Sequence, residues 1–78
     1  MQVTLRASTG VWIDVWHEHC LFCARGHDQL GEPQTCLAVD LFEVIAELAQ
    51  LDLEDETQAA EAMSIAERAE RRLTGRSS

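Results

Sequence analysis

Apolar residues in this chain recur with two different periods, and the change of period limits the folds that the chain can adopt. Between residues 3 and 16 they alternate with polar residues, and a period of two indicates half-buried strands. Ser8-Thr9-Gly10 interrupts the alternation, and glycine readily takes the positive φ of a tight turn. The segment therefore predicts an antiparallel β-hairpin over residues 3–16.

From Leu37 onward the apolar residues are spaced three and four positions apart, as on one face of an amphipathic helix. We expect a first helix over residues 37–50. Pro33 precedes this segment, and Thr35 is the candidate N-cap. The period has changed from that of a strand to that of a helix within one short chain.

A second helix is predicted over residues 56–73, because Asp55 followed three residues later by Gln58 resembles a capping box. Its apolar face is made mostly of alanine, at Ala59, Ala62, Met63, Ala66, Ala69 and Leu73. A stripe of small residues lets another helix approach closely. One alternative is therefore a self-assembling protein that forms a homodimer through this helix.

The fold class predicted from these elements is α+β, with an N-terminal antiparallel hairpin, a connecting loop and two antiparallel helices. The 78 residues make one domain, over residues 1–76, and residues 77–78 are expected to fray. A chain of this length is near the size at which one hydrophobic core becomes marginal, so a metal or a second subunit is often needed.

Trp12 and Trp16 share one side of the second predicted strand with Asp14. We expect the helices to cover this side, which makes the tryptophans core or boundary residues. If the helices leave it open, the tryptophans form an aromatic patch of the kind enriched at protein interfaces. A platform for stacking nucleic-acid bases is the weaker interpretation, because almost no cationic residues adjoin them in the sequence.

All three cysteines and all three histidines lie between residues 17 and 36, and this segment is predicted to be a metal loop. Structural zinc takes four ligands, usually thiolates and imidazoles, and Cys-x-x-Cys spacing lets one turn direct two sulfurs toward one ion. We therefore predict a structural Zn²⁺ site. Its four ligands are predicted to be Cys20, Cys23, His27 and Cys36.

Other assignments of this segment remain open. His17 or His19 could replace His27 as a ligand, and Cys36 could be an ordinary buried cysteine at the start of a helix. The three cysteines could also be reduced core residues without a metal. A disulfide or redox pair is a further alternative, although an odd number of cysteines fits a disulfide framework poorly.

The segment Cys20-Leu-Phe-Cys23, followed by Gly26, resembles a zinc knuckle. A hairpin that ends in a knuckle, followed by a helix whose first turn supplies Cys36, is similar to the treble-clef type of zinc finger over residues 11–45. The resemblance implies that the metal ties the hairpin to the first helix and contributes folding free energy. The spacing departs from that of retroviral knuckles, so nucleic-acid binding is not implied.

Charge is the main guide to partners. The net charge is −8, and between Asp40 and Glu61 there are eight acidic residues with no lysine or arginine. Such a surface argues against binding phosphates directly and is compatible with a basic protein partner. It could also be only a solvated helix face that keeps the chain soluble.

We predict a small acidic protein-interaction or adaptor module that binds a basic protein surface. A sharper version is an inhibitor that occupies a nucleic-acid-binding protein by presenting carboxylates in place of phosphates. The predicted partner-binding residues are Glu43, Glu47, Glu54 and Glu56. A nucleic-acid-binding zinc finger that uses Arg6, Arg25 and the C-terminal arginines is the alternative from another class.

Catalysis is not predicted. Glu18 between His17 and His19 could be drawn as the base of a zinc enzyme, but the chain has no His-Glu-x-x-His helix and no lysine, and it is too small to enclose a substrate readily. The sequence also shows no apolar run long enough to span a membrane and no signal-peptide pattern. We therefore expect a cytoplasmic protein that is not an enzyme.

Overall fold

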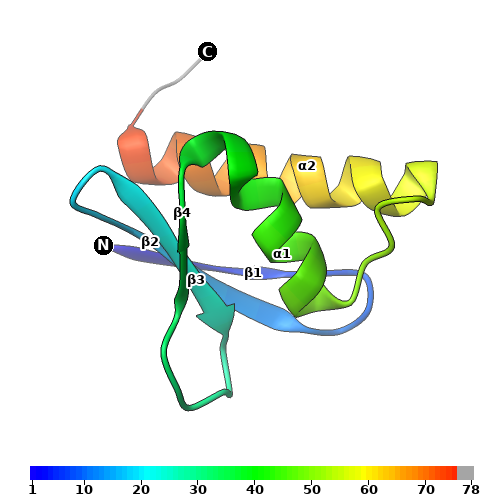
Figure 1. The fold of residues 1–78 in the computed structure, drawn as a ribbon, viewed down its shortest axis with the longest axis horizontal. Helices are drawn as coiled ribbons and strands as arrows, with labels where there is room; N and C mark the ends of the chain where they lie inside the picture. The colour runs from blue at the N-terminus through cyan, green and yellow to red at the C-terminus, as the bar shows by residue number, and fades with distance from the viewer. Residues whose placement is uncertain (76–78) are drawn as a thin grey trace.

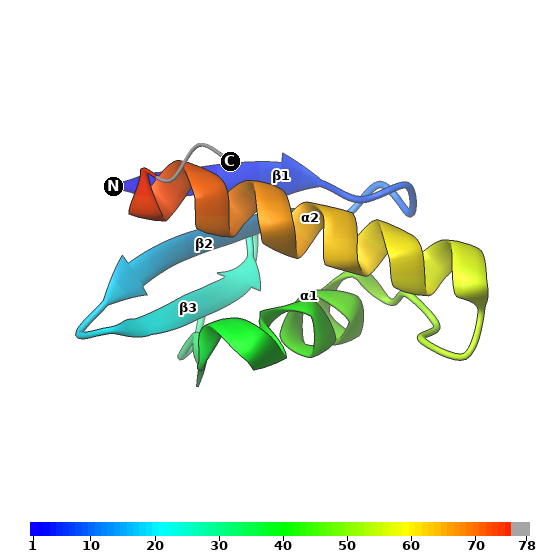
Figure 2. The same ribbon diagram turned by 90° about the horizontal axis from the view of Figure 1, so that it is seen from above.

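A four-stranded antiparallel sheet and two helices form two layers in the computed structural model of this chain (Figures 1 and 2). The structure describes residues 1–75, so the predicted frayed tail at 77–78 lies outside the described residues. The predicted α+β class is confirmed. The elements are β1 (Gln2–Arg6), β2 (Trp12–Glu18), β3 (Leu21–Gly26), β4 (Gln34–Cys36), the 3₁₀ helix η1 (Ala38–Asp40), α1 (Leu41–Ala49) and α2 (Glu56–Thr74).

Strands β1 and β2 form the predicted N-terminal hairpin. Val3 pairs with Val15 and Leu5 with Ile13, which places the alternating apolar residues on one face of the sheet. Gly10 takes a φ of 92° in the turn, where its N–H donates to the Ala7 carbonyl at 2.9 Å. The alternation of the sequence therefore predicts both the strands and the face that they bury.

The predicted metal loop over residues 17–36 is wrong as a description of the backbone, because most of it extends the sheet. β2 continues to Glu18, β3 pairs with β2, and β4 pairs with β3 in the strand order β1-β2-β3-β4. His19 and Cys20 form the two-residue turn between β2 and β3, with φ values of 51° and 67°. Two positive φ values are typical of a type I′ hairpin turn, for which Asn-Gly is the usual signal.

The first helix starts later than predicted. Thr35 is not an N-cap, because it pairs with Cys23 in the sheet. The segment Ala38–Asp40 forms η1, and α1 begins at Leu41. The apolar spacing from Leu37 therefore predicts the helical segment correctly but not its first turn.

The second helix follows the prediction closely, with α2 spanning Glu56–Thr74 against the predicted 56–73. The Asp55 carboxylate accepts hydrogen bonds from the backbone N–H groups of Thr57 and Gln58 at 2.9 and 3.2 Å. This bonding satisfies two N–H groups that the helix itself leaves without partners. The predicted N-cap is confirmed.

Both helices pack on the same face of the sheet, with α2 over β1 and β2 and with α1 mainly over β2, β3 and β4 (Figure 2). The residues that are almost completely buried between the layers are Ile13, Val15, Leu41, Ile45 and Ile65. The alanines at 62, 66 and 69 are also buried in this core, so the alanine stripe of α2 packs within the chain. The opposite face of the sheet is left open.

Candidate functional site

The predicted zinc ligands lie in four different environments. Cys20 is exposed in the β2–β3 turn, whereas Cys23 is buried and Cys36 is partly buried. In the register of β3 and β4, Cys23 pairs with Thr35 while Cys36 pairs with Phe22, so the two sulfurs lie on opposite faces of the sheet. Cys36 packs against the core, and burial raises the pKa of its thiol, with the charge of Asp40 adding to this.

No three Cys, His, Asp or Glu side chains within residues 1–75 come together as a group that could hold a metal ion. The alternative ligands do not complete such a group. His17 lies against the Phe22 ring, with centroids 4.8 Å apart, and His19 is exposed beyond the end of β2. As placed, the predicted residues do not fit a four-ligand zinc centre, and zinc binding stays a prediction.

His27 instead belongs to a hydrogen-bonded cluster on the open face of the sheet. Its Nδ1 atom lies 2.9 and 3.0 Å from the two carboxylate oxygens of Asp14. The Thr4 hydroxyl donates to the same carboxylate at 2.7 Å. Asp14 is only 3% exposed, so its buried carboxylate is held between Thr4 on β1 and His27, which follows β3.

The charge state of this cluster follows from its partners. Burial raises the pKa of Asp14, but the hydrogen bonds from Thr4 and His27 and the positive charges of His27 and Arg25 outweigh it, so the pKa lies below its ordinary value of 3.8. Asp14 is therefore ionised at neutral pH and can only accept hydrogen bonds. It follows that Nδ1 of His27 carries a proton and that Nε2 is the ring nitrogen left without this partner.

A carboxylate that fixes the tautomer of a histidine is found both in catalytic triads and behind metal ligands. A nucleophile is the missing part here. Within the described residues, the only side chain hydrogen-bonded to the His27 ring is that of Asp14, so the contact between nucleophile and base that covalent catalysis uses is not formed. The arrangement connects Thr4 on β1, Asp14 on β2 and His27, which follows β3, by hydrogen bonds on the open face of the sheet.

Two tryptophans flank this cluster, and each lies beside an arginine from a neighbouring strand. The Arg6 guanidinium is 5.9 Å from the centre of the Trp12 ring, and the Arg25 guanidinium is 5.5 Å from that of Trp16. Trp12 remains 47% exposed. The expectation that the helices cover the tryptophans is wrong, because the helices pack on the other face.

Sequence reasoning missed these cations because strand pairing supplies them. Arg6 pairs with Trp12 across β1 and β2, and Arg25 lies diagonally across from Trp16, beside Cys23 on β3. Cross-strand neighbours are close in space but distant in sequence. The predicted hairpin was the available signal for Arg6, whereas β3, which carries Arg25, was not predicted as a strand.

The helical layer carries a second candidate surface, a groove between the start of α1 and the middle of α2. Its volume is about 240 Å³. We refer to it as the interhelical groove, and it is lined by Ala38, Val39, Phe42, Met63, Ala66, Glu67 and Glu70. Val39 is 73% exposed and Met63 is 50% exposed, so the groove presents apolar side chains to solvent, with two carboxylates among them.

The four predicted partner-binding glutamates, Glu43, Glu47, Glu54 and Glu56, are all exposed. Glu43 and Glu47 lie on α1, whereas Glu54 lies in the turn before α2 and Glu56 is the first residue of α2. None of the four lines the interhelical groove. The carboxylates that do line it, Glu67 and Glu70, were not among the predicted residues, because their position opposite Phe42 depends on how the helices pack.

Comparison with protein-family models, with curated proteins and with solved structures found no match. Within the described residues, no helix is long and apolar enough to cross a membrane.

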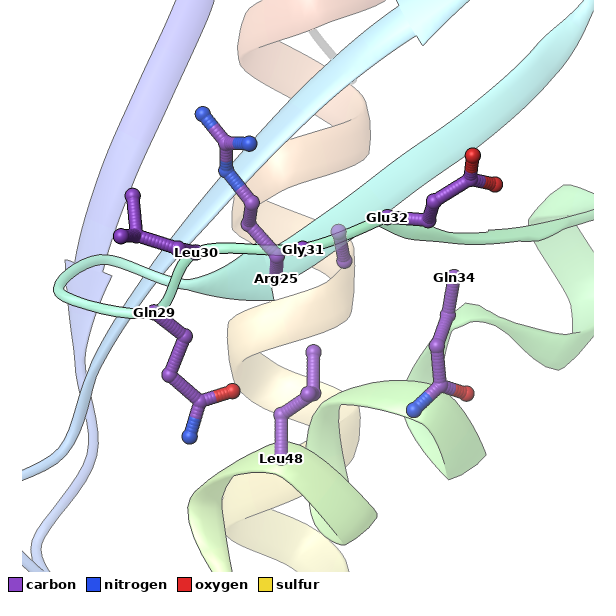
Figure 3. A pocket seen from close by; sticks show the side chains of 8 residues that line it. Arg25, Gln29, Leu30, Gly31, Glu32, Gln34 and Leu48 are labelled. Carbon is purple, nitrogen blue, oxygen red and sulfur yellow. The ribbon is translucent and has the colours of Figure 1, made fainter.

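A small cavity lies under the β3–β4 connection (Figure 3). Its volume of about 120 Å³ is well below the several hundred Å³ of a typical ligand pocket. Leu48 and Gln34 extend from the helical and β4 sides, while Arg25 points away from them. Leu30, in the same connection, is fully exposed. We therefore attribute this cavity to loose packing of the β3–β4 connection and not to a ligand site.

Proposed function

We propose that this chain is a protein-interaction module that captures a basic, apolar segment of a partner protein in the interhelical groove. The observation that supports the proposal is the combination of exposed apolar side chains and carboxylates in one concave surface. Val39 and Met63 are at least half exposed, and Glu67 and Glu70 line the same groove. Burial of such apolar surface supplies affinity, and the carboxylates select for a positively charged partner.

The remaining charge of the helical layer supports the same kind of partner. Glu43 and Glu47 are exposed on α1, and no lysine or arginine occurs between Asp40 and Glu61. A basic segment approaching the groove therefore meets an excess of negative charge. Charges outside the contact mainly raise the association rate and give it a dependence on salt.

The test uses a synthetic amphipathic helix of leucine and lysine as the probe, with a leucine–glutamate helix of the same pattern as its control. We expect the lysine peptide to bind, and Glu67→Gln with Glu70→Gln to weaken binding about three- to tenfold, since exposed ion pairs contribute up to about 1 kcal/mol each. Neutralising Glu43, Glu47, Glu54 and Glu56 should lower the association rate more than it raises the dissociation rate.

Glu32→Gln serves as the matched control, because Glu32 is an exposed carboxylate in the β3–β4 connection, remote from the groove. Equal weakening by Glu32→Gln would show that only net charge matters and would contradict the proposal. The same holds if Met63→Ser leaves the affinity unchanged, because the apolar part of the groove would then have no role.

The inhibitor version of this proposal names a nucleic-acid-binding protein as the partner. DNA or RNA should then compete with the chain for that protein, and a lack of competition would leave only the general adaptor proposal. The predicted zinc is not part of the proposal, since its ligands do not converge. Pairing of two copies through α2 and a cytoplasmic location stay predictions.

A further inference from the structure

A third surface cavity lies between β1 and the C-terminal half of α2, which run side by side (Figure 2). Its volume is about 290 Å³, and it is lined by Leu5, Arg68, Arg71 and Arg72. Three of the six basic residues of a chain with net charge −8 therefore surround one hollow. This surface is distinct from the interhelical groove and carries the opposite charge.

Within the described residues, no carboxylate lies at ion-pair distance from the three guanidinium groups, although the charge of Arg68 contributes to the lowered pKa of Glu61. The ion pairs there involve only His19 and His27, so no arginine has a carboxylate oxygen within 4.0 Å. Arg68 makes one hydrogen bond, from Nε to the backbone carbonyl of Ser64 at 3.4 Å. Planar guanidinium groups bind carboxylates with paired hydrogen bonds, and among residues 1–75 these three form no such pair.

The cavity also adjoins an open sheet edge, because β1 is the first strand in the order β1-β2-β3-β4 and pairs only with β2. The N–H of Ala7 donates to the carbonyl of Val11 at 2.9 Å, so Ala7 faces β2. Hydrogen-bonded and free residues alternate along an antiparallel strand. It follows that the backbone N–H and C=O groups of Gln2, Thr4 and Arg6 point away from β2 and toward the free edge.

We propose that an extended acidic peptide of a partner protein adds to β1 as a fifth strand, with carboxylates at alternate positions bound by Arg68, Arg71 and Arg72. Side chains of an added strand alternate between the two faces of the sheet, so every second one lies on the side of Leu5 and α2. Backbone hydrogen bonds to Gln2, Thr4 and Arg6 supply affinity, and the arginines supply selectivity.

The charge of the site argues for this occupant over a second copy of the chain. Pairing of β1 with β1 of another copy brings two sets of these arginines to the same edge, and like charges in one interface are unfavourable. An acidic strand instead neutralises them. The proposal uses a different surface and the opposite partner charge from the interhelical groove, so either can fail without the other.

The experiment titrates the full chain with a peptide of alternating glutamate and valine, and with a lysine–valine peptide as its control. We expect binding of the glutamate peptide only, with slowed hydrogen exchange at the amides of Thr4 and Arg6 and little change at Leu5. Arg68→Gln, Arg71→Gln and Arg72→Gln should each weaken binding about three- to tenfold. Arg25→Gln removes the same charge from the open sheet face and should leave the affinity within twofold.

Three results would overturn the proposal. The first is peptide binding without protection of the Thr4 and Arg6 amides, because no strand is then added. The second is equal weakening by Arg25→Gln, which reduces the effect to net charge. The third is dimerisation of the chain alone with the same two amides protected, because the edge is then occupied by a second copy. Circular dichroism of each variant checks that the fold is retained.

Discussion

Replacing Asp14 with asparagine tests the buried cluster on the open sheet face. The variant keeps the size of the side chain but removes the charge that accepts hydrogen bonds from Thr4 at 2.7 Å and from His27 at 2.9 Å. Asp14 is 3% exposed, so water cannot readily replace these partners. We expect a loss of stability that depends on pH.

The magnitude can be worked out from the two contacts. A hydrogen bond to a charged group contributes about 1.5–3 kcal/mol to stability. The His27 side chain is 49% exposed, so solvent screening reduces its contribution to about 0.5–1 kcal/mol. The sum predicts that Asp14→Asn lowers the free energy of unfolding by about 2–4 kcal/mol. A chain of 78 residues has a total stability of only about 4–12 kcal/mol, so the effect is easily measured.

The pH dependence has a definite sign. The pKa of Asp14 is lowered in the folded chain, so its contribution is present above the unfolded value and is lost as pH falls through the folded value. The wild type and Asp14→Asn should therefore differ at neutral pH and converge as pH falls through the folded value of Asp14. Groups that do not contact Asp14 titrate alike in both proteins and cancel in the difference, whereas His27, which contacts the carboxylate directly, contributes to it.

Urea denaturation followed by tryptophan fluorescence and circular dichroism at several pH values measures this difference. Asp28→Asn is the matched control, because Asp28 is an exposed carboxylate in the same part of the chain. The reasoning is refuted if Asp14→Asn costs as much at pH 2 as at pH 7. It is also refuted if Asp28→Asn has the same effect.

Two further predictions concern the contacts between layers and the metal. Glu61→Gln should lower the free energy of unfolding by about 1 kcal/mol, because Glu61 accepts hydrogen bonds from the Ser8 backbone N–H at 2.6 Å and from the Ser8 hydroxyl at 2.5 Å. These bonds lower the pKa of Glu61, so the loss of stability should fade as pH falls through the folded value. In urea denaturation, Glu32→Gln makes an equal charge change and should show neither effect. EDTA should leave the circular dichroism and the melting temperature unchanged, because Cys23 and Cys36 lie on opposite faces of the sheet and are not placed to bind one ion together. One zinc per chain in native mass spectrometry, with unfolding on its removal, would contradict this.

The sequence by itself determined the fold class and the second helix. Alternation at Val3, Leu5, Ile13 and Val15 specifies two strands and their buried face, because side chains alternate along a pleated strand. The cap at Asp55 likewise depends on groups only two and three residues away. Such local features do not require knowledge of the rest of the chain.

The prediction of a loop over residues 17–36 is wrong about the backbone, because cysteine spacing carries no information on strand pairing. Phe22 and Ala24 lie on the buried face of β3, and this alternation is visible in the sequence. The turn at His19 and Cys20 carries no glycine or asparagine, so the usual hairpin signal was missing. The same residues that suggested a knuckle therefore form an ordinary two-residue turn and a strand.

Only the tertiary structure decided which side chains share a surface. Sheet pairing brings Asp14 to His27 and places arginines beside Trp12 and Trp16. Packing of α2 along β1 gathers Arg68, Arg71 and Arg72 around Leu5. These contacts join residues that are distant along the chain, and their partners depend on strand order and helix placement, for which hydrophobic periodicity carries no information.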